Sequence, residues 1–274
     1  MIPSFSSGVN SLIGGGYKEN IIYSLYGLPN TGKTLFVIQE IGNFLKNKYR
    51  VLWIDTEGGG QAMIDAWAGK FFDIKNENLY YNEFLVYEDV MRYLGYEVEV
   101  LTDKKKTEVN MVGEIKKDIG VNETFGRLKN NTAIVVDSIT SLFRLRFSDS
   151  SQNFSARATA TGYLIFALEK LAKKTNAVLL FTHHASLNPT NPYQTLGVMR
   201  GGNTLMYYSK YILYIEKSRK KLLSDYRKIY GVRLPDSKEW EKTAWLKITD
   251  NGYVDVPESE ILALLKGKDE KDED

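Results

Sequence analysis

Cysteine is absent from the 274 residues of the chain. Its absence excludes disulfide bridges, thiolate zinc sites and cysteine nucleophiles. A chain without disulfides suits a reducing compartment, and we expect a cytoplasmic protein. The first residues carry no basic segment followed by a long apolar run, so no secretory signal is predicted. No stretch approaches the roughly 20 apolar residues of a membrane-spanning helix, so we expect no membrane partner.

A strong excess of one charge is also missing. The chain carries 36 Lys and Arg against 34 Asp and Glu, which gives a net charge of +2. A protein so close to neutral does not bind nucleic acid by bulk charge, and any such contact must come from local clusters. Five of the last six residues, 269–274, are acidic, and they predict a solvated tail.

Apolar runs and helical periodicity alternate along the chain. This alternation predicts an α/β fold with a mostly parallel central sheet that is flanked by helices on both faces. The clearest helical segments are 34–45 and 161–174. Near the end, 243–248 and 253–256 flank an Asn-Gly turn and predict a β-hairpin. Five apolar runs predict the strands of the core: 21–26, 51–54, 133–136, 177–181 and 211–215.

Two stretches are expected to be additions to a single domain that spans residues 1–268. Residues 96–112 alternate in polarity around three lysines and predict an exposed hairpin with a basic tip. Residues 217–242 are rich in Lys and Arg and predict a basic insertion. Four apolar residues of this insertion fall at helical spacing and offer a face for a protein partner: Leu222, Leu223, Tyr226 and Tyr230.

Residues 27–34 match the phosphate-binding pattern G-x-x-x-x-G-K-[ST] at every fixed position. The motif follows an apolar strand and opens an amphipathic helix, which is the context that such a loop requires. Lys33 is expected to reach the β- and γ-phosphates of a nucleotide, and Thr34 to bind Mg²⁺. A purely structural glycine turn would not need lysine followed by threonine. The predicted nucleotide-binding residues are Gly27, Leu28, Pro29, Asn30, Thr31, Gly32, Lys33, Thr34 and Leu35.

Two more apolar strands run into acids that would face this loop. Asp137 ends one of them, and we expect it to contact Mg²⁺, although it could simply cap the following turn. Glu57 follows the other and is the candidate for orienting or deprotonating the attacking water, with a plain surface acid as the alternative. Asp55 is expected to support Glu57 or to bond nearby backbone. Lys33 and Glu57 are therefore the predicted catalytic residues.

These strings, in this order, resemble the RecA/RadA recombinase superfamily, and most closely the archaeal RadA paralogues, which include RadB-like proteins. The string Ile-Asp-Thr-Glu-Gly at 54–58 matches a family motif whose glutamate is the catalytic acid. The resemblance implies a RecA-like P-loop NTPase core that uses ATP and Mg²⁺. It spans residues 7 to about 256, and the other resembling segments are 7–16, 135–144, 201–203 and 244–252.

Two departures from the family pattern bear on function. Recombinases of the family commonly carry a sensor glutamine after the fourth core strand, and His184 occupies that place here. Imidazole can still hydrogen-bond to a γ-phosphate or to the attacking water. Alternatively, His183 and His184 form a structural pair at a strand end. We expect no counterpart of the family's small N-terminal DNA-binding domain, which would disfavour independent filament formation.

In the resembling family two loops face DNA, and they correspond here to about 144–157 and 186–202. The resemblance therefore makes single-stranded DNA an expected partner. Arginines can pair with phosphates, and a tyrosine offers a face for base stacking. Polar loops lie on the surface of any protein, so the alternative without DNA stays open. The candidate DNA contacts are Arg144, Arg146, Arg157, Tyr193 and Arg200.

The sequence thus favours an accessory recombination ATPase, slow or stimulated by DNA, that binds single-stranded DNA and modulates a RadA-type recombinase. A KaiC-like signalling ATPase, which controls protein partners without touching DNA, shares the same core and is the main alternative. A nucleotide-binding adaptor without hydrolysis and a full recombinase are the others. A homo-oligomer is compatible with each of them.

Overall fold

Strands and helices alternate along the part of the chain that the computed structural model describes, residues 1–73, 75–99, 114–118, 128, 130–143, 154–186, 197–200, 202–218, 220–236 and 242–269. The strands are β1 (Ile22–Gly27), β2 (Arg50–Asp55), β3 (Leu79–Glu83), β4 (Tyr96–Glu99), β5 (Glu114–Asp118), β6 (Thr132–Asp137), β7 (Ala177–Ser186), β8 (Val198–Met199), β9 (Tyr211–Lys217), β10 (Tyr226–Arg233), β11 (Thr243–Thr249) and β12 (Gly252–Val256). The helices are α1 (Ser7–Leu12), α2 (Lys33–Lys46), α3 (Gly60–Met63), η1 (Ile64–Ala68, a π-helical turn), α4 (Gly69–Phe71), α5 (Tyr87–Tyr93), η3 (Ser141–Phe143, 3₁₀), α6 (Phe154–Thr175), α7 (Gly202–Tyr208), η5 (Lys221–Leu223, 3₁₀) and α8 (Glu258–Asp269).

The main sheet is parallel in its centre and antiparallel at one end. In the described residues its order is β12-β11-β10-β9-β1-β7-β6-β2-β3, and β8 pairs with β7. The strands from β9 to β3 run parallel, whereas β10, β11 and β12 continue the sheet antiparallel to β9. The five predicted core strands, the parallel sheet and the C-terminal hairpin are all confirmed.

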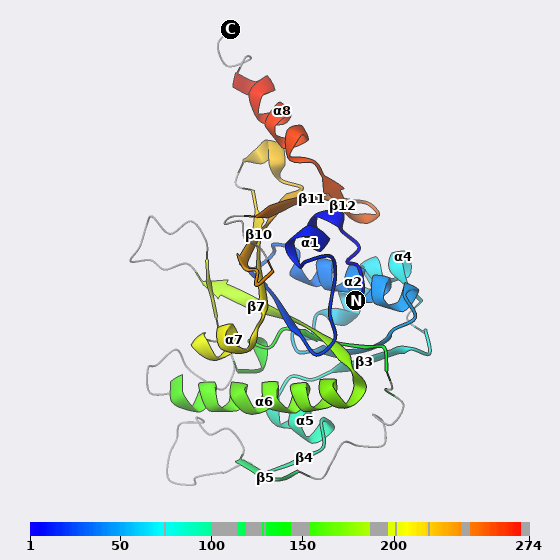
Figure 1. Ribbon diagram of the computed structural model, residues 1–274, viewed down its shortest axis with the longest axis vertical. Coiled ribbons are helices and arrows are strands. Elements are labelled where there is room, and N and C mark those ends of the chain that lie inside the picture. Colours follow the sequence, from blue (N-terminus) through cyan, green and yellow to red (C-terminus); the bar gives the residue numbers. More distant parts are fainter. Residues whose placement is uncertain are drawn as a thin grey trace.

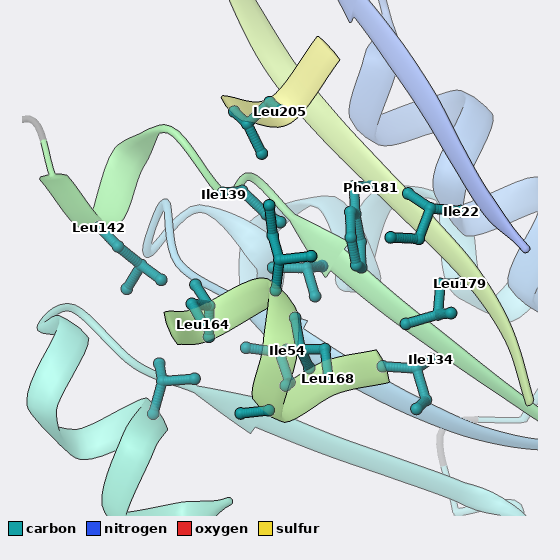
Figure 2. Packing of buried hydrophobic residues seen from close by; sticks show 14 of the residues in the cluster. Ile22, Ile54, Ile134, Ile139, Leu142, Leu164, Leu168, Leu179, Phe181 and Leu205 are labelled. Carbon is teal, nitrogen blue, oxygen red and sulfur yellow. The ribbon is translucent and has the colours of Figure 1, made fainter. Parts of the chain in front are cut away.

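Helices cover both faces of this sheet (Figure 1), which explains why the core strands are buried at almost every position. Along β2, Leu52 and Ile54 face the side covered by α5, α6 and α7, whereas Val51 and Trp53 face α1 and α2. Strands β1, β6 and β7 alternate in the same way. Figure 2 shows the first of these two cores, with Leu164 and Leu168 of α6 lying against the sheet residues.

The parallel register brings the C-terminal ends of the central strands to one edge. Gly27, the last residue of β1, lies opposite His184 of β7. Asp55 of β2 lies opposite Asp137 of β6. The segments that follow β1, β2, β6 and β7 therefore start next to one another, which is where ligands bind in open α/β sheets.

The stretch 217–242 is not an insertion, because it contains β10, which lies between β9 and β11 in the main sheet. The helical spacing inferred for its apolar residues is wrong as well. The true period is two: Arg227 and Ile229 are buried, whereas Lys228 and Tyr230 on the other face are half-buried. Of the basic residues that made the stretch look like a solvated addition, Lys228 lies on this half-buried face and Arg227 on the buried one.

The predicted hairpin at 96–112 is only partly correct. Tyr96–Glu99 forms β4, but its antiparallel partner is β5 at Glu114–Asp118, apart from the main sheet. The predicted second arm, 107–112, and the basic tip lie outside the described residues. The acidic tail lies there too, except for Asp269, which ends α8. No helix in the described ranges is long and apolar enough to cross a membrane.

A buried glutamate of α2 links this helix to the N-terminal segment through hydrogen bonds. Glu40 accepts hydrogen bonds from the hydroxyls of Ser4 and Tyr17, the latter at 2.9 Å, and from the Asn43 amide at 3.2 Å. Burial raises the pKa of Glu40 from 4.5 to about 7, although these hydrogen bonds oppose the shift. The folded protein therefore favours the protonated form of Glu40 more than the unfolded chain does.

This shift gives the folded state a pH dependence. Below pH 4.5 both states hold the proton, and between pH 4.5 and about 7 only the folded state does. Stability should therefore fall by roughly 3 kcal/mol across this window and level off above it. We expect Glu40→Gln to flatten that part of the profile, measured by urea unfolding at pH 5 and pH 8. Exposed Glu19→Gln is the control and should keep the wild-type slope; an unchanged slope in Glu40→Gln would contradict this assignment.

Candidate functional site

The phosphate-loop sequence forms the connection between β1 and α2. The Lys33 ammonium donates hydrogen bonds to the carbonyl oxygens of Gly27 at 3.1 Å and Leu28 at 3.0 Å. Burial lowers the pKa of Lys33, and the nearby charges of Asp137 and Glu57 oppose this shift. A Cβ atom at Gly27 would lie 2.5 Å from the Ile215 carbonyl oxygen, so this position has no space for a side chain.

The predicted metal ligands Thr34 and Asp137 come together beside the loop. Asp137 is buried and accepts hydrogen bonds from the hydroxyls of Thr182 and Thr34. Its pKa is raised to about 6, mainly by burial and by the charge of Glu57, against the effect of these two hydrogen bonds. A hydroxyl and a carboxylate are hard oxygen donors of the kind that Mg²⁺ prefers.

No group of three or more His, Cys, Asp or Glu residues in the described ranges has a metal-binding arrangement. Mg²⁺ is commonly held by one or two protein oxygens together with substrate phosphates and water. The donor chemistry of Thr34 and Asp137 is therefore compatible with a magnesium ion that arrives with a nucleotide. Their role as ligands stays a prediction.

Glu57 lies in a small polar cluster at the end of β2. Its Oε1 atom is 2.9 Å from His184 Nε2 and accepts a hydrogen bond from the Ser141 hydroxyl at 3.2 Å. Ser141 Oγ is also 3.3 Å from the His184 ring nitrogen. Burial would raise the pKa of Glu57, but hydrogen bonds from His184 and Ser138, and the charges of His184 and Lys33, lower it to about 2. Glu57 is therefore ionised at any ordinary pH.

Asp55 supports Glu57 through the backbone. One carboxylate oxygen accepts the N–H of Glu57 at 2.9 Å, and the other accepts the Tyr81 hydroxyl at 3.1 Å. This is the backbone bond expected of Asp55. The turn that carries the Glu57 side chain is thus anchored to β3 as well as to β2.

The two adjacent histidines have different environments. His183 is fully buried, its Nε2 atom lies 2.8 Å from Ser24 Oγ, and burial lowers its pKa to about 3. Its role is structural. His184 is the next residue of the strand, so its side chain lies on the opposite face of the sheet, where it contacts Glu57. Its backbone N–H donates to the Thr140 hydroxyl at 3.0 Å. Of the two histidines, His184 is the one that contacts Glu57, and its role as a sensor stays a prediction.

Of the predicted DNA contacts, Arg144, Arg146 and Tyr193 lie outside the described residues. Arg157 lies in the first turn of α6 and is half-buried. Arg200 is exposed next to β8, and its backbone N–H donates to the His184 carbonyl at 2.8 Å. The pairing of β8 with β7 thus brings the two ends of the second predicted loop together beside His184.

The sequence analysis missed two side chains that reach the phosphate loop from the C-terminal strands. Arg227 of β10 and Tyr253 of β12 both hydrogen-bond to the loop carbonyl of Thr31. Arg227 was visible only as one member of a basic cluster. The period-two alternation of residues 226–230 was the signal that could have placed it on the inner face of a strand.

A family model and several known proteins match most of this chain. A family model described as "ATPase: KaiC" matches residues 2–189. The DNA repair and recombination protein RadB of Thermococcus sibiricus is 30% identical over 257 residues, which cover 93% of this chain and 96% of that protein. RadB of Methanocaldococcus jannaschii is 30% identical over 205 residues, covering 74% of this chain and 81% of the relative.

A solved structure is similar over nearly the whole chain. It is described as the crystal structure of the RadB recombinase, with a TM-score of 0.57 and 21% sequence identity. The match covers 94% of this chain and 100% of that one. At this identity the likeness shows that the two chains share a fold, the RecA-like α/β fold with its parallel sheet.

The contact between His184 and Glu57 makes a measurable prediction. Removing the imidazole in His184→Ala should let the pKa of Glu57 rise from about 2 toward its ordinary value of 4.5. Carboxyl ¹³C resonances of Glu-labelled protein, titrated by NMR, give this pKa, and Glu57→Gln identifies the resonance. Tyr81→Phe removes a hydroxyl that bonds to Asp55 and Glu83 and not to the Glu57 side chain, so it should leave this pKa low. A pKa that stays near 2 without His184 would assign the shift to Lys33 and the serines.

Proposed function

Because the chain belongs to the RadB group of the KaiC-type ATPase family, we propose that it is an ATP-hydrolysing accessory protein of DNA recombination and repair. One observation carries the chemistry: Lys33, Thr34, Asp137 and Glu57 meet at the same edge of the sheet. A phosphate loop without these acids could bind a nucleotide but would have no group to orient water.

In this proposal each side chain has a separate task. Lys33 leaves its contacts with the loop carbonyls and bonds to β- and γ-phosphate oxygens. Thr34 and Asp137 hold Mg²⁺, which neutralises charge on the phosphates when it is bound. Glu57 orients the attacking water and accepts its proton. With a pKa of about 2 it is a weak base while His184 stays bonded to it, which favours slow hydrolysis.

The proposal includes single-stranded DNA as a partner and a RadA-type recombinase as the protein that is modulated. The relatives named as DNA repair and recombination proteins support this assignment over the signalling alternative. The structure offers a physical route for coupling: the exposed Arg200 lies one hydrogen bond away from His184, which contacts Glu57. Single-stranded DNA bound at Arg200 would therefore affect His184, which contacts the Glu57 carboxylate that is proposed to activate water.

The separate tasks of Lys33 and Glu57 can be distinguished by substitution. Lys33→Ala should lose ATP binding and turnover together. Glu57→Gln should bind ATP·Mg²⁺ as tightly as the wild type while hydrolysis falls by roughly 100-fold or more. Calorimetry gives the affinity, and phosphate release gives the rate. Lys46→Ala at the other end of α2 and Glu83→Gln on β3 are the matched controls. Wild-type hydrolysis in Glu57→Gln would remove its catalytic assignment.

DNA binding should appear in the salt dependence. We expect single-stranded DNA to stimulate hydrolysis and to lose affinity steeply as salt rises, because phosphate contacts release counterions. Arg200→Ala should reduce the slope of log affinity against log salt by about 1. Arg92→Ala, on α5, should leave the slope unchanged. A rate that ignores DNA at every salt concentration would favour the signalling alternative.

A further inference from the structure

Two buried side chains from the C-terminal strands hold the backbone of the phosphate loop. The Arg227 guanidinium donates from Nε to the Thr31 carbonyl at 2.8 Å. The Tyr253 hydroxyl donates to the carbonyls of Thr31 at 3.4 Å and Gly32 at 3.2 Å. Arg227 is 6% exposed and Tyr253 is 3% exposed, so both contacts are shielded from water.

Strand pairing and α2 fix these two side chains in place. Arg227 lies opposite Leu246 in the β10–β11 ladder. Tyr253 is held by Gln39 of α2, whose amide accepts the Tyr253 N–H at 2.7 Å and donates to its carbonyl at 2.9 Å. A Cβ atom at Gly32 would lie 2.0 Å from the Tyr253 hydroxyl oxygen, so the glycine of the motif also makes room for this contact.

The direction of these hydrogen bonds determines what they do. A trans peptide unit is planar, and its C=O and N–H groups point to opposite sides. The Thr31 carbonyl shares a unit with the Gly32 N–H, and the Gly32 carbonyl shares one with the Lys33 N–H. Fixing these two carbonyls therefore aims two N–H groups at the opposite side, where this motif presents them to phosphate oxygens.

Charge adds to this effect. In the part of the chain that the structure describes, the Arg227 guanidinium bonds to neutral groups: the carbonyls of Thr31, Ser224 and Tyr226, and the Tyr253 hydroxyl. A guanidinium stays protonated at any working pH. Its charge, partly desolvated against the loop backbone, raises the electrostatic potential where a polyphosphate would lie.

We propose that Arg227 and Tyr253 are positioning residues that preorganise the phosphate loop for the polyphosphate of a nucleotide. The C-terminal antiparallel strands are then part of the nucleotide site, although they lie far from the loop in sequence. This inference rests on the proposed nucleotide binding. It concerns how tightly the phosphates are held and assigns no chemistry to either residue.

The test compares two arginines of the same strand. Arg233 also donates to backbone carbonyls, those of Met206 and Ser209, but away from the loop. We expect Arg227→Met to weaken ATP·Mg²⁺ binding about 10-fold, and Tyr253→Phe about 3-fold, in calorimetric titrations. Arg233→Met should stay within about 2-fold of the wild type. Arg227→Lys keeps the charge without the planar fork and should bind with intermediate affinity.

A phosphate-specific readout separates positioning from general stability. The loss in Arg227→Met should be larger for ATP than for AMP, since only the longer phosphate chain fills the loop. A loss that is equal for both nucleotides, or a similar loss in Arg233→Met, would overturn the inference. If Arg227→Met does not fold, Arg227→Lys and Tyr253→Phe decide it. If the wild-type protein does not bind ATP, the proposed function itself is wrong. If the wild type binds ATP and the variants bind it equally well, only the inference about Arg227 and Tyr253 is wrong.

Discussion

The proposed nucleotide site depends on a constraint of the peptide unit: an N–H group can face a ligand only if the carbonyl of the same unit faces away. Each loop carbonyl therefore needs a partner outside the ligand space. Arg227 and Tyr253 supply partners for the carbonyls of Thr31 and Gly32. The glycines at 27 and 32 leave space for the chain segments that come close behind the loop.

The two acids next to the loop show how environment sets chemistry on one sheet edge. Glu57 and Asp137 follow or end neighbouring strands, yet their pKa values move apart, to about 2 and about 6. Glu57 is partly exposed and surrounded by donors, whereas Asp137 is buried and repelled by Glu57. At the proposed site a proton would therefore compete with a cation at Asp137 in mildly acidic solution, whereas the Glu57 carboxylate would stay charged.

Sequence alone predicted the features whose signals are local. These features are the core strands, the loop motif and the acids at the ends of β2 and β6. Each is a contiguous segment whose hydrophobic period or residue spacing is sufficient to predict it. The contact of His184 with Glu57 depends on the order of strands in the sheet, which cannot be read from any single segment of the sequence. β10 was mistaken for an insertion because the stretch 217–242 around it is rich in Lys and Arg, and the hairpin boundary was wrong because β5 starts beyond the alternation that suggested it.

The hydrogen bonds from Arg227 and Tyr253 span 196 and 222 residues of sequence to Thr31. During synthesis on the ribosome, the loop leaves the exit tunnel long before these partners exist. Until β10 and β12 emerge and pair, nothing from that end of the sheet braces the loop backbone. Under the proposed function, a nascent chain therefore reaches its full affinity for nucleotide only after β10 and β12 have emerged and paired.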